Sequence, residues 1–119
     1  MVLTYYELRY NIIHNMARKS SGGPADDPEV LILSSLAGGP KHGYAIMTDV
    51  EQFAGVALGP GTLYSAIARL VENKWIEPMS ESGRQRPYRI TPKGNLRLES
   101  QLDRMKAMAN FGLRRLKLA

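Results

Sequence analysis

The chain has no cysteine, and it has no long uninterrupted apolar stretch. Without thiols, both disulfide bridges and thiolate zinc sites are excluded. No apolar run approaches the roughly 18 residues of a membrane-spanning helix. The N-terminal stretch carries Glu7 and Arg9 and lacks the basic start and small-residue cleavage site of a secretory signal. We therefore expect a cytoplasmic protein without a membrane segment.

Clusters of catalytic or metal-binding residues are also missing from the sequence. His14 and His42 stand far apart, and His42 is expected to cap or pack rather than to bind a ligand. Neighbouring acids such as Asp49 and Glu51 fall on different faces of a predicted helix, with no base, nucleophile or Gly-rich phosphate cradle to complete a catalytic set. We therefore expect no enzyme activity, no cofactor and no metal ion.

The distribution of charge says more than the total of +5. Residues 29–91 hold six basic and six acidic side chains, whereas residues 92–119 hold seven basic and two acidic ones. Overall basicity is therefore a weak argument for nucleic-acid binding. The local pattern is stronger, because Arg84, Arg86 and Arg89 occupy three of six consecutive positions.

A length of 119 residues, 44% of them hydrophobic, predicts one globular domain. The N-terminal segment has an apolar stripe at helical spacing and predicts a helix over about residues 5–19. A Ser-Gly-Pro run at 20–24 then interrupts the helix. Residues 1–24 are therefore predicted to form a separable helical arm, and the stripe consists of Leu3, Tyr6, Tyr10, Ile13 and Ala17.

Three short helices are predicted to follow. The first begins with Asp27-Pro28, a helix cap followed by proline, and stops at Gly38-Gly39-Pro40. The second should run over about residues 43–53, and its inner face should consist of Ile46, Met47, Val50 and Phe53. The third begins at Pro60, and its apolar face should consist of Leu63, Ala66, Ile67, Leu70 and Val71.

The apolar period changes after the third helix. Residues 75–79 and 87–91 are short β-like runs separated by a polar loop that contains Arg84, Gln85 and Arg86. They predict a hairpin with a basic tip. Arg89 should face outward on the second strand, either free in solvent or in a structural pair.

Thr91-Pro92 begins a last helix whose apolar stripe runs for about five turns. That stripe is more apolar surface than one small core can easily cover, and a subunit interface is its natural use. Met105, Met108 and Phe111 could line an effector cavity in that interface, although such a cluster is more often interface core. The predicted dimerisation residues are Leu98, Leu102, Met105, Ala109, Leu113 and Leu116.

Three helices, a basic hairpin and a long helix are the order of a winged helix-turn-helix module. The predicted fold is mostly α with a small β-hairpin: an arm over 1–24, a winged helix-turn-helix domain over 25–91 and a dimerisation helix over 92–119. From Val30 to Gly94 the sequence also resembles the PadR-type bacterial transcriptional regulators. The residues that carry the resemblance are Ile32-Leu33, Leu36, Gly39-Pro40-Lys41-His42-Gly43-Tyr44, Ile46, Gly61-Thr62-Leu63-Tyr64, Ala66, Arg69-Leu70, Gly83-Arg84, Tyr88-Arg89-Ile90-Thr91 and Gly94.

The resemblance implies a homodimeric repressor with a roughly palindromic operator, from the small subfamily with a single long C-terminal helix. The sequence departs from the family pattern at three places. Gly59 stands where a serine or threonine cap is usual, Ser65 replaces a frequent proline, and Asn73-Lys74 replaces a frequent glycine. These departures affect cap strength and base preference more than the fold.

The predicted DNA contacts come from three places. The third helix enters the major groove, the wing approaches the backbone or minor groove, and the start of the second helix offers backbone donors and a cation to a phosphate. The alternatives without DNA contact are packing at the edge of the core for Tyr64, a solvated charge for Arg69 and a solvated tip for the hairpin. The predicted contact residues are Lys41, Tyr44, Thr62, Tyr64, Ser65, Arg69, Arg84, Gln85 and Arg86.

The main alternative function is a winged-helix adaptor that binds only proteins, because the same fold supports both uses. A small-molecule effector at the dimer interface is compatible with DNA binding. The arginine-rich wing favours DNA.

Overall fold

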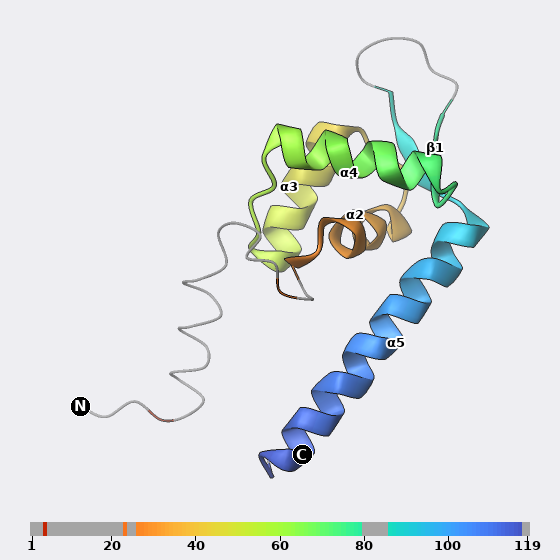
Figure 1. Cartoon of the computed structure of the whole chain (residues 1–119). Coiled ribbons are helices and arrows are strands. Elements are labelled where there is room, and N and C mark those ends of the chain that lie inside the picture. The colour runs from red at the N-terminus through yellow and green to blue at the C-terminus, as the bar shows by residue number, and fades with distance from the viewer. Residues whose placement is uncertain (1–3, 5–22, 24–25, 80–85, 118–119) are drawn as a thin grey trace.

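The structure is a computed structural model of the chain and describes residues 4, 23, 26–79 and 86–117 (Figure 1). The described elements are helices α2 (Pro28–Ala37), α3 (Gly43–Ala54) and α4 (Pro60–Glu72), strands β1 (Ile76–Pro78) and β2 (Tyr88–Ile90), and helix α5 (Pro92–Arg115). The predicted order of three helices, a hairpin and a long helix is confirmed. The predicted arm helix over about residues 5–19 lies outside the described residues.

Helix α2 is the centre of the fold and contacts α3, α4, α5 and β2. A helix surrounded by protein needs apolar side chains on every face. The predicted start is confirmed, since the Asp27 carboxylate accepts a hydrogen bond from the Glu29 N–H at 2.9 Å. The buried side chains of α2 include Val30, Leu31, Ile32, Leu33 and Leu36.

Helices α3 and α4 bury the apolar stripes that face α2, and Gly55 ends α3 with a left-handed φ of 68°. The predicted inner face of α4 is confirmed. On α3 the prediction was wrong for Phe53, which is exposed. Phe53 lies on the same side of the helix as Ile46, but it stands in the last turn of α3, where half of its surface is exposed.

The two wing strands pair antiparallel, with Ile76 opposite Ile90 and Glu77 opposite Arg89. The Arg89 Nε lies 2.5 Å from the Glu77 Oε1, so Arg89 forms the structural pair that was one of its two predicted roles. An exposed pair of this kind stabilises a protein by about 1 kcal/mol at most.

The loop after α2 adds one further rung to the wing. The Lys41 N–H donates to the Tyr88 carbonyl at 3.1 Å, and the Tyr88 N–H donates to the Lys41 carbonyl at 2.9 Å. This antiparallel bridge attaches β2 to the loop between α2 and α3.

Helix α5 begins at the predicted cap. The Thr91 hydroxyl oxygen accepts from the Gly94 N–H at 2.9 Å and donates to the Lys74 carbonyl at 2.7 Å. Gly94 and Leu98 are buried against the domain, and the C-terminal part of the helix extends away from the other elements (Figure 1). None of the helices described is both long and apolar enough to span a membrane.

Candidate nucleic-acid interface

Helix α4 turns one face to the core and the other to solvent. Leu63, Ala66, Ile67 and Leu70 are buried, while Thr62, Tyr64, Ser65 and Arg69 are exposed. The cap residue Gly59 offers no side-chain hydrogen bond, so the first-turn N–H groups of α4 have no side-chain acceptor from that residue. Such a helix start favours an anionic ligand only in combination with the polar side chains around it.

Ser65 and Arg69 are joined on the exposed face of α4. The Arg69 Nη1 donates to the Ser65 hydroxyl oxygen at 3.1 Å, and the Asn73 amide nitrogen donates to the Arg69 carbonyl at 2.8 Å. The two residues stand one helical turn apart, and the bond directs the guanidinium along the helix surface. Ser65, which departs from the family pattern, therefore acts as a partner of Arg69.

Tyr44 and the hydroxyl end of Tyr64 both lie near the start of α3. Tyr44 is 77% exposed in the first turn of α3, and Tyr64 is 50% exposed. The Tyr64 hydroxyl reaches the start of α3, where a Cβ added to Gly43 would lie 2.5 Å from it. Tyr64 thus both packs against α3 and keeps part of its ring in solvent.

A groove of about 350 Å³ lies between α4 and the wing. Its walls combine an apolar floor with two tyrosines and one arginine from the wing. Such a groove suits a ligand that carries both apolar and anionic groups. The lining residues are Tyr64, Ile67, Ala68, Val71, Pro78, Arg86 and Tyr88.

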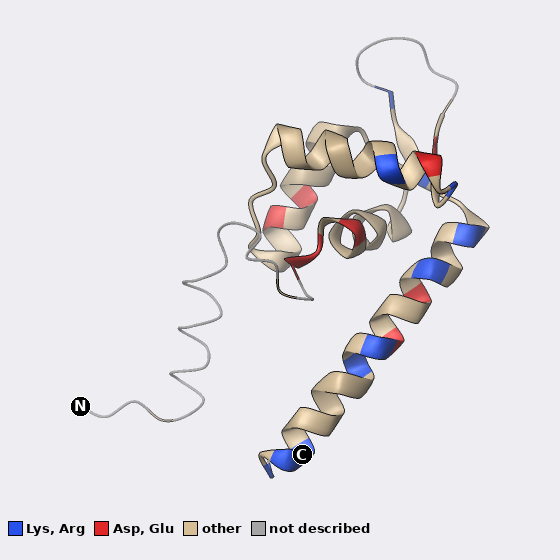
Figure 2. Ribbon diagram, viewed as in Figure 1, with Lys and Arg blue, Asp and Glu red and all other residues tan. Residues whose placement is uncertain are grey.

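The basic side chains of the described residues are not gathered only at this groove. Figure 2 shows Lys and Arg along the length of α5 as well as on α4 and beside the wing. Arg86 is exposed next to β2. Arg84 and Gln85, the other predicted wing contacts, lie outside the described residues.

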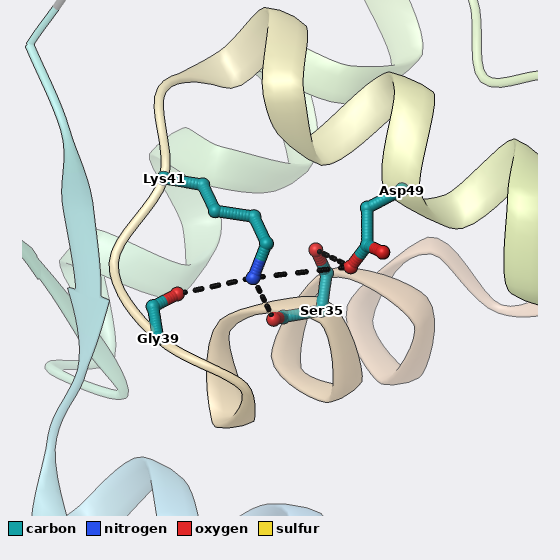
Figure 3. Close-up of polar contacts among 4 residues, drawn as sticks. All are labelled: Ser35, Gly39, Lys41 and Asp49. Atoms are coloured by element: carbon teal, nitrogen blue, oxygen red, sulfur yellow. Dashed lines mark hydrogen bonds and ion pairs between the residues drawn. The ribbon is translucent and has the colours of Figure 1, made fainter.

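Lys41, a predicted phosphate contact, has its side chain bonded within the domain. Its Nζ donates to the Ser35 carbonyl at 2.5 Å and to the Gly39 carbonyl at 3.2 Å, and it lies 3.9 Å from the Asp49 Oδ2 (Figure 3). The Ser35 hydroxyl donates to the same Asp49 oxygen at 2.7 Å. The ammonium group is therefore held in a partly buried position by α2, the loop and α3.

The predicted dimerisation stripe on α5 divides into two parts. Leu98 is only 7% exposed and belongs to the core of the domain, so the prediction that it lies in the interface does not match its place. It is buried because the first turns of α5 pack on the domain. Met105 packs partly against the same core, whereas Leu102 and Leu116 are exposed, Ala109 is exposed and Leu113 is half-buried.

Sequence reasoning missed Arg97. Its Nε donates to the Glu29 carboxylate at 2.7 Å, and its guanidinium lies 4.6 Å from the centroid of the Trp75 ring. No local signal marks this contact, because Glu29 and Trp75 lie on other elements. The large exposed side chain of Leu96 was also missed.

No three His, Cys, Asp or Glu residues that the structure describes come together as a possible metal site. The described part of the groove likewise holds hydroxyls, an arginine and apolar groups, with no carboxylate or histidine in its lining.

Residues 32–100 match the family model of the transcriptional regulator PadR-like family. An uncharacterized 37.1 kDa protein in a transposon of Streptomyces fradiae is 48% identical over 80 residues, which are 67% of this chain and 23% of that protein. The chain thus spans less than a quarter of that relative.

Several solved structures share this architecture. A PadR family transcription regulator from hypervirulent Clostridium difficile has a TM-score of 0.66 and 26% identity, over 75% of this chain and 97% of that chain. A transcriptional regulator from Clostridium thermocellum has a TM-score of 0.64 and 28% identity, over 72% and 89%. A winged-helix DNA-binding protein from STIV shares the fold alone, with a TM-score of 0.59 and 20% identity over 65% and 85%.

Proposed function

Since this chain belongs to the transcriptional regulator PadR-like family, we propose that it binds double-stranded operator DNA as a homodimer and represses transcription. Members of this family are regulators rather than enzymes, and the proposal contains no catalytic step. One observation carries it: α4 exposes Thr62, Ser65 and Arg69 to solvent, and the groove along another side of α4 is bounded by Arg86 of the wing.

In this proposal α4 enters the major groove and the wing follows the adjoining backbone. Arginine makes bidentate hydrogen bonds to guanine, so Arg69, with Ser65 bonded to it, is assigned to base reading. Thr62, Tyr44 and Tyr64 are assigned to phosphates, which hydroxyls bind without regard to sequence. On the wing the assignment covers Arg84, Gln85 and Arg86.

The proposed dimer contact is the exposed stripe of α5 that begins at Leu102. Leu102 is 42% exposed, and Phe111 and Leu116 are also largely exposed. A two-fold dimer places two α4 helices on half-sites about 34–36 Å apart, or a multiple of that distance, which matches a roughly palindromic operator. A protein with this role acts in the cytoplasm, and it represses by occupying its operator.

A small-molecule effector at this dimer interface is part of the proposal. Met108 and Phe111 are large exposed apolar side chains that lie toward the C-terminal end of α5. An effector between them and the partner would change the affinity for DNA by changing the dimer. Ligands selected by thermal shift should lose their effect on operator binding in Met108→Ser.

The DNA test begins with selection of bound fragments from genomic DNA, followed by binding titrations at several salt concentrations. Arg69→Ala should reduce the preference for operator over random DNA. Arg86→Ala should weaken binding to both and flatten the log–log salt slope by about 0.9 per contact, hence about 1.8 per dimer. A reporter gene behind the selected operator should be repressed by the wild type.

Arg104→Ala is the matched control, because it removes one exposed arginine from α5, away from α4 and the wing. It should leave both the discrimination and most of the affinity unchanged. If the folded wild type selects no operator and its weak DNA binding is indifferent to Arg69→Ala and Arg86→Ala, the adaptor function replaces the proposal.

Dimerisation has its own test. Leu102→Glu places a charge in the exposed stripe and should give a monomer in sedimentation velocity, with the domain still folded by circular dichroism. Glu99→Gln, on the same helix and exposed, is the control. A dimer of unchanged stability in Leu102→Glu would reject the stripe as the interface.

A further inference from the structure

We infer that Lys41 is a positioning residue for DNA binding: it fixes the wing relative to the helix-turn-helix and does not itself bind phosphate. The inference rests on the proposed function, because it assumes that the wing contacts DNA. It starts from the fact that Lys41 joins three separate parts of the domain through its backbone and its side chain.

The backbone of Lys41 holds the wing. Both main-chain hydrogen bonds of Tyr88 on this side of β2 go to Lys41, at 3.1 and 2.9 Å. Tyr88 is opposite Pro78 in the hairpin, but its N–H and its carbonyl both point away from β1, toward Lys41. Lys41 therefore anchors the outer edge of β2 at Tyr88. Arg86 lies only two residues before Tyr88, and both residues line the groove beside α4.

The side chain of Lys41 holds the loop that carries this backbone. The Nζ is bonded to the Ser35 carbonyl near the end of α2, where a cation also interacts favourably with the helix dipole. Asp49 connects the same group to α3, both through the 3.9 Å ion pair and through its bond from Ser35. Ser35 is buried, so this network is part of the packed domain (Figure 3).

The two halves of the contact make one connection. From β2 it runs through the Lys41 backbone to the Lys41 side chain and then to α2 and α3. Removing the side chain leaves the rung with Tyr88 on a loop that lacks its anchor. The wing then keeps its two strands but no longer has a fixed distance from α4. When α4 lies in the major groove of DNA, Arg86 is therefore no longer held against the DNA backbone.

The first test uses the free protein and needs no DNA. Hydrogen exchange measured by NMR reports on the Tyr88 N–H, which donates to the Lys41 carbonyl. Lys41→Met should speed exchange at Tyr88 by about tenfold or more, because the rung opens locally, while amides in the middle of α2 keep their protection. Unchanged protection at Tyr88 overturns the inference, whatever the protein does with DNA.

The second test is a double-mutant cycle on the selected operator. Arg86→Ala should weaken DNA binding by a large factor in the wild type and by a factor about fivefold smaller in Lys41→Met. The reason is that Lys41→Met already misplaces the Arg86 side chain that the second substitution removes. If the losses of DNA-binding free energy for the two substitutions are additive, Lys41 acts independently of Arg86 and the inference is overturned. Lys106→Met is the matched control, since it removes an exposed lysine of α5, and its cycle with Arg86→Ala should be additive.

Asp49→Asn guards against failure of Lys41→Met to fold. This change removes a negative charge, so long-range electrostatics alone predicts tighter DNA binding. Positioning predicts the opposite sign: weaker binding and a smaller effect of Arg86→Ala. Tighter binding with an unchanged Arg86→Ala effect overturns the inference. If no variant and no wild type binds DNA, the proposed function has failed, and the exchange of Tyr88 alone decides whether Lys41 anchors the wing.

Discussion

Lys74 has a left-handed backbone, with a φ of 63°, at the turn between α4 and β1. Its N–H donates to the Val71 carbonyl, and the N–H of Trp75 donates to the Leu70 carbonyl, so the turn completes the end of the helix. A residue with a Cβ is strained there by about 1 kcal/mol or more. The family pattern often has a glycine in this place, and the structure gives the reason.

Lys74→Gly should therefore stabilise the domain, by about 0.5–1 kcal/mol after allowing for the greater freedom of glycine in the unfolded chain. Urea unfolding followed by circular dichroism measures the change. The control is Lys106→Gly in the middle of α5, which should destabilise by about 1 kcal/mol. Equal effects of the two substitutions would contradict the role of the positive φ.

Gly94 is needed for the opposite reason, since it lies against another backbone. A Cβ at this position would overlap the Trp75 carbonyl oxygen, which itself accepts from the Thr91 N–H. Gly94→Ala must push α5 away from the domain and should cost several kcal/mol, on the order of the larger single-residue effects. Thermal unfolding should show a clear loss for Gly94→Ala and none for Gly112→Ala, because nothing lies within 4 Å of Gly112.

Individual side chains differ in how far the sequence predicts them. The exposed positions of Arg69 and Ser65 can be predicted from the helical period alone, because the opposite face of α4 is apolar. The position of the Lys41 side chain cannot be predicted in this way. Its sequence neighbours suggest a helix start with a cation near a phosphate, but Ser35 and Asp49 sit six and eight residues away on two different helices. Tertiary packing decides which way such a side chain turns.

Helix ends show the same contrast at the scale of elements. The caps of α2 and α5 could be predicted, because Asp27-Pro28 and Thr91-Pro92 are strong local signals, and both cap hydrogen bonds are present. The start of α4 has no such bond, since Gly59 has no side chain to provide it. The three helices therefore begin with unequal stability.

Gly59→Ser should add a cap to α4 and stabilise it by a few tenths of a kcal/mol, about the difference between glycine and serine at this position. The backbone there is extended, and no atom lies within 4 Å of an added Cβ. Asp27→Ala removes an existing cap from α2 and should cost about 1 kcal/mol. Chemical denaturation of both variants tests the pair. A larger gain from Gly59→Ser than loss from Asp27→Ala would contradict this account of the caps.

The extent of α5 could be predicted, but its division between core and free surface could not. One apolar stripe runs from Leu98 to Leu116 in the sequence. Where the stripe leaves the domain depends on how α5 crosses α2 and the wing, which local spacing does not contain. Phe53 illustrates the same limit on α3, because a correct helical face says nothing about where the covering element ends.

For the whole molecule, the direction in which α5 leaves the domain connects the two halves of the proposed function. If α5 forms the dimer, its angle to α2 determines how far apart the two α4 helices lie on DNA. Two contacts set that angle beyond the packing of Leu98. The close approach of Gly94 to Trp75 is one, and Arg97, bonded to Glu29 and stacked on Trp75, is the other.

Arg97→Met keeps an unbranched, largely apolar side chain over Trp75 but removes the bond to Glu29. We expect a folded dimer whose preference among operator half-site spacings is broader, because the angle of α5 is less strictly held. The preference is measured by binding to a series of operators in which roughly one to three base pairs are added or removed between the half-sites. These steps are small compared with one turn of the DNA helix. Arg104→Met, on the exposed part of α5, is the control and should keep the wild-type spacing preference. If Arg97→Met keeps the same sharp preference, packing alone fixes the angle of α5, and the bond from Arg97 to Glu29 has no part in spacing the half-sites.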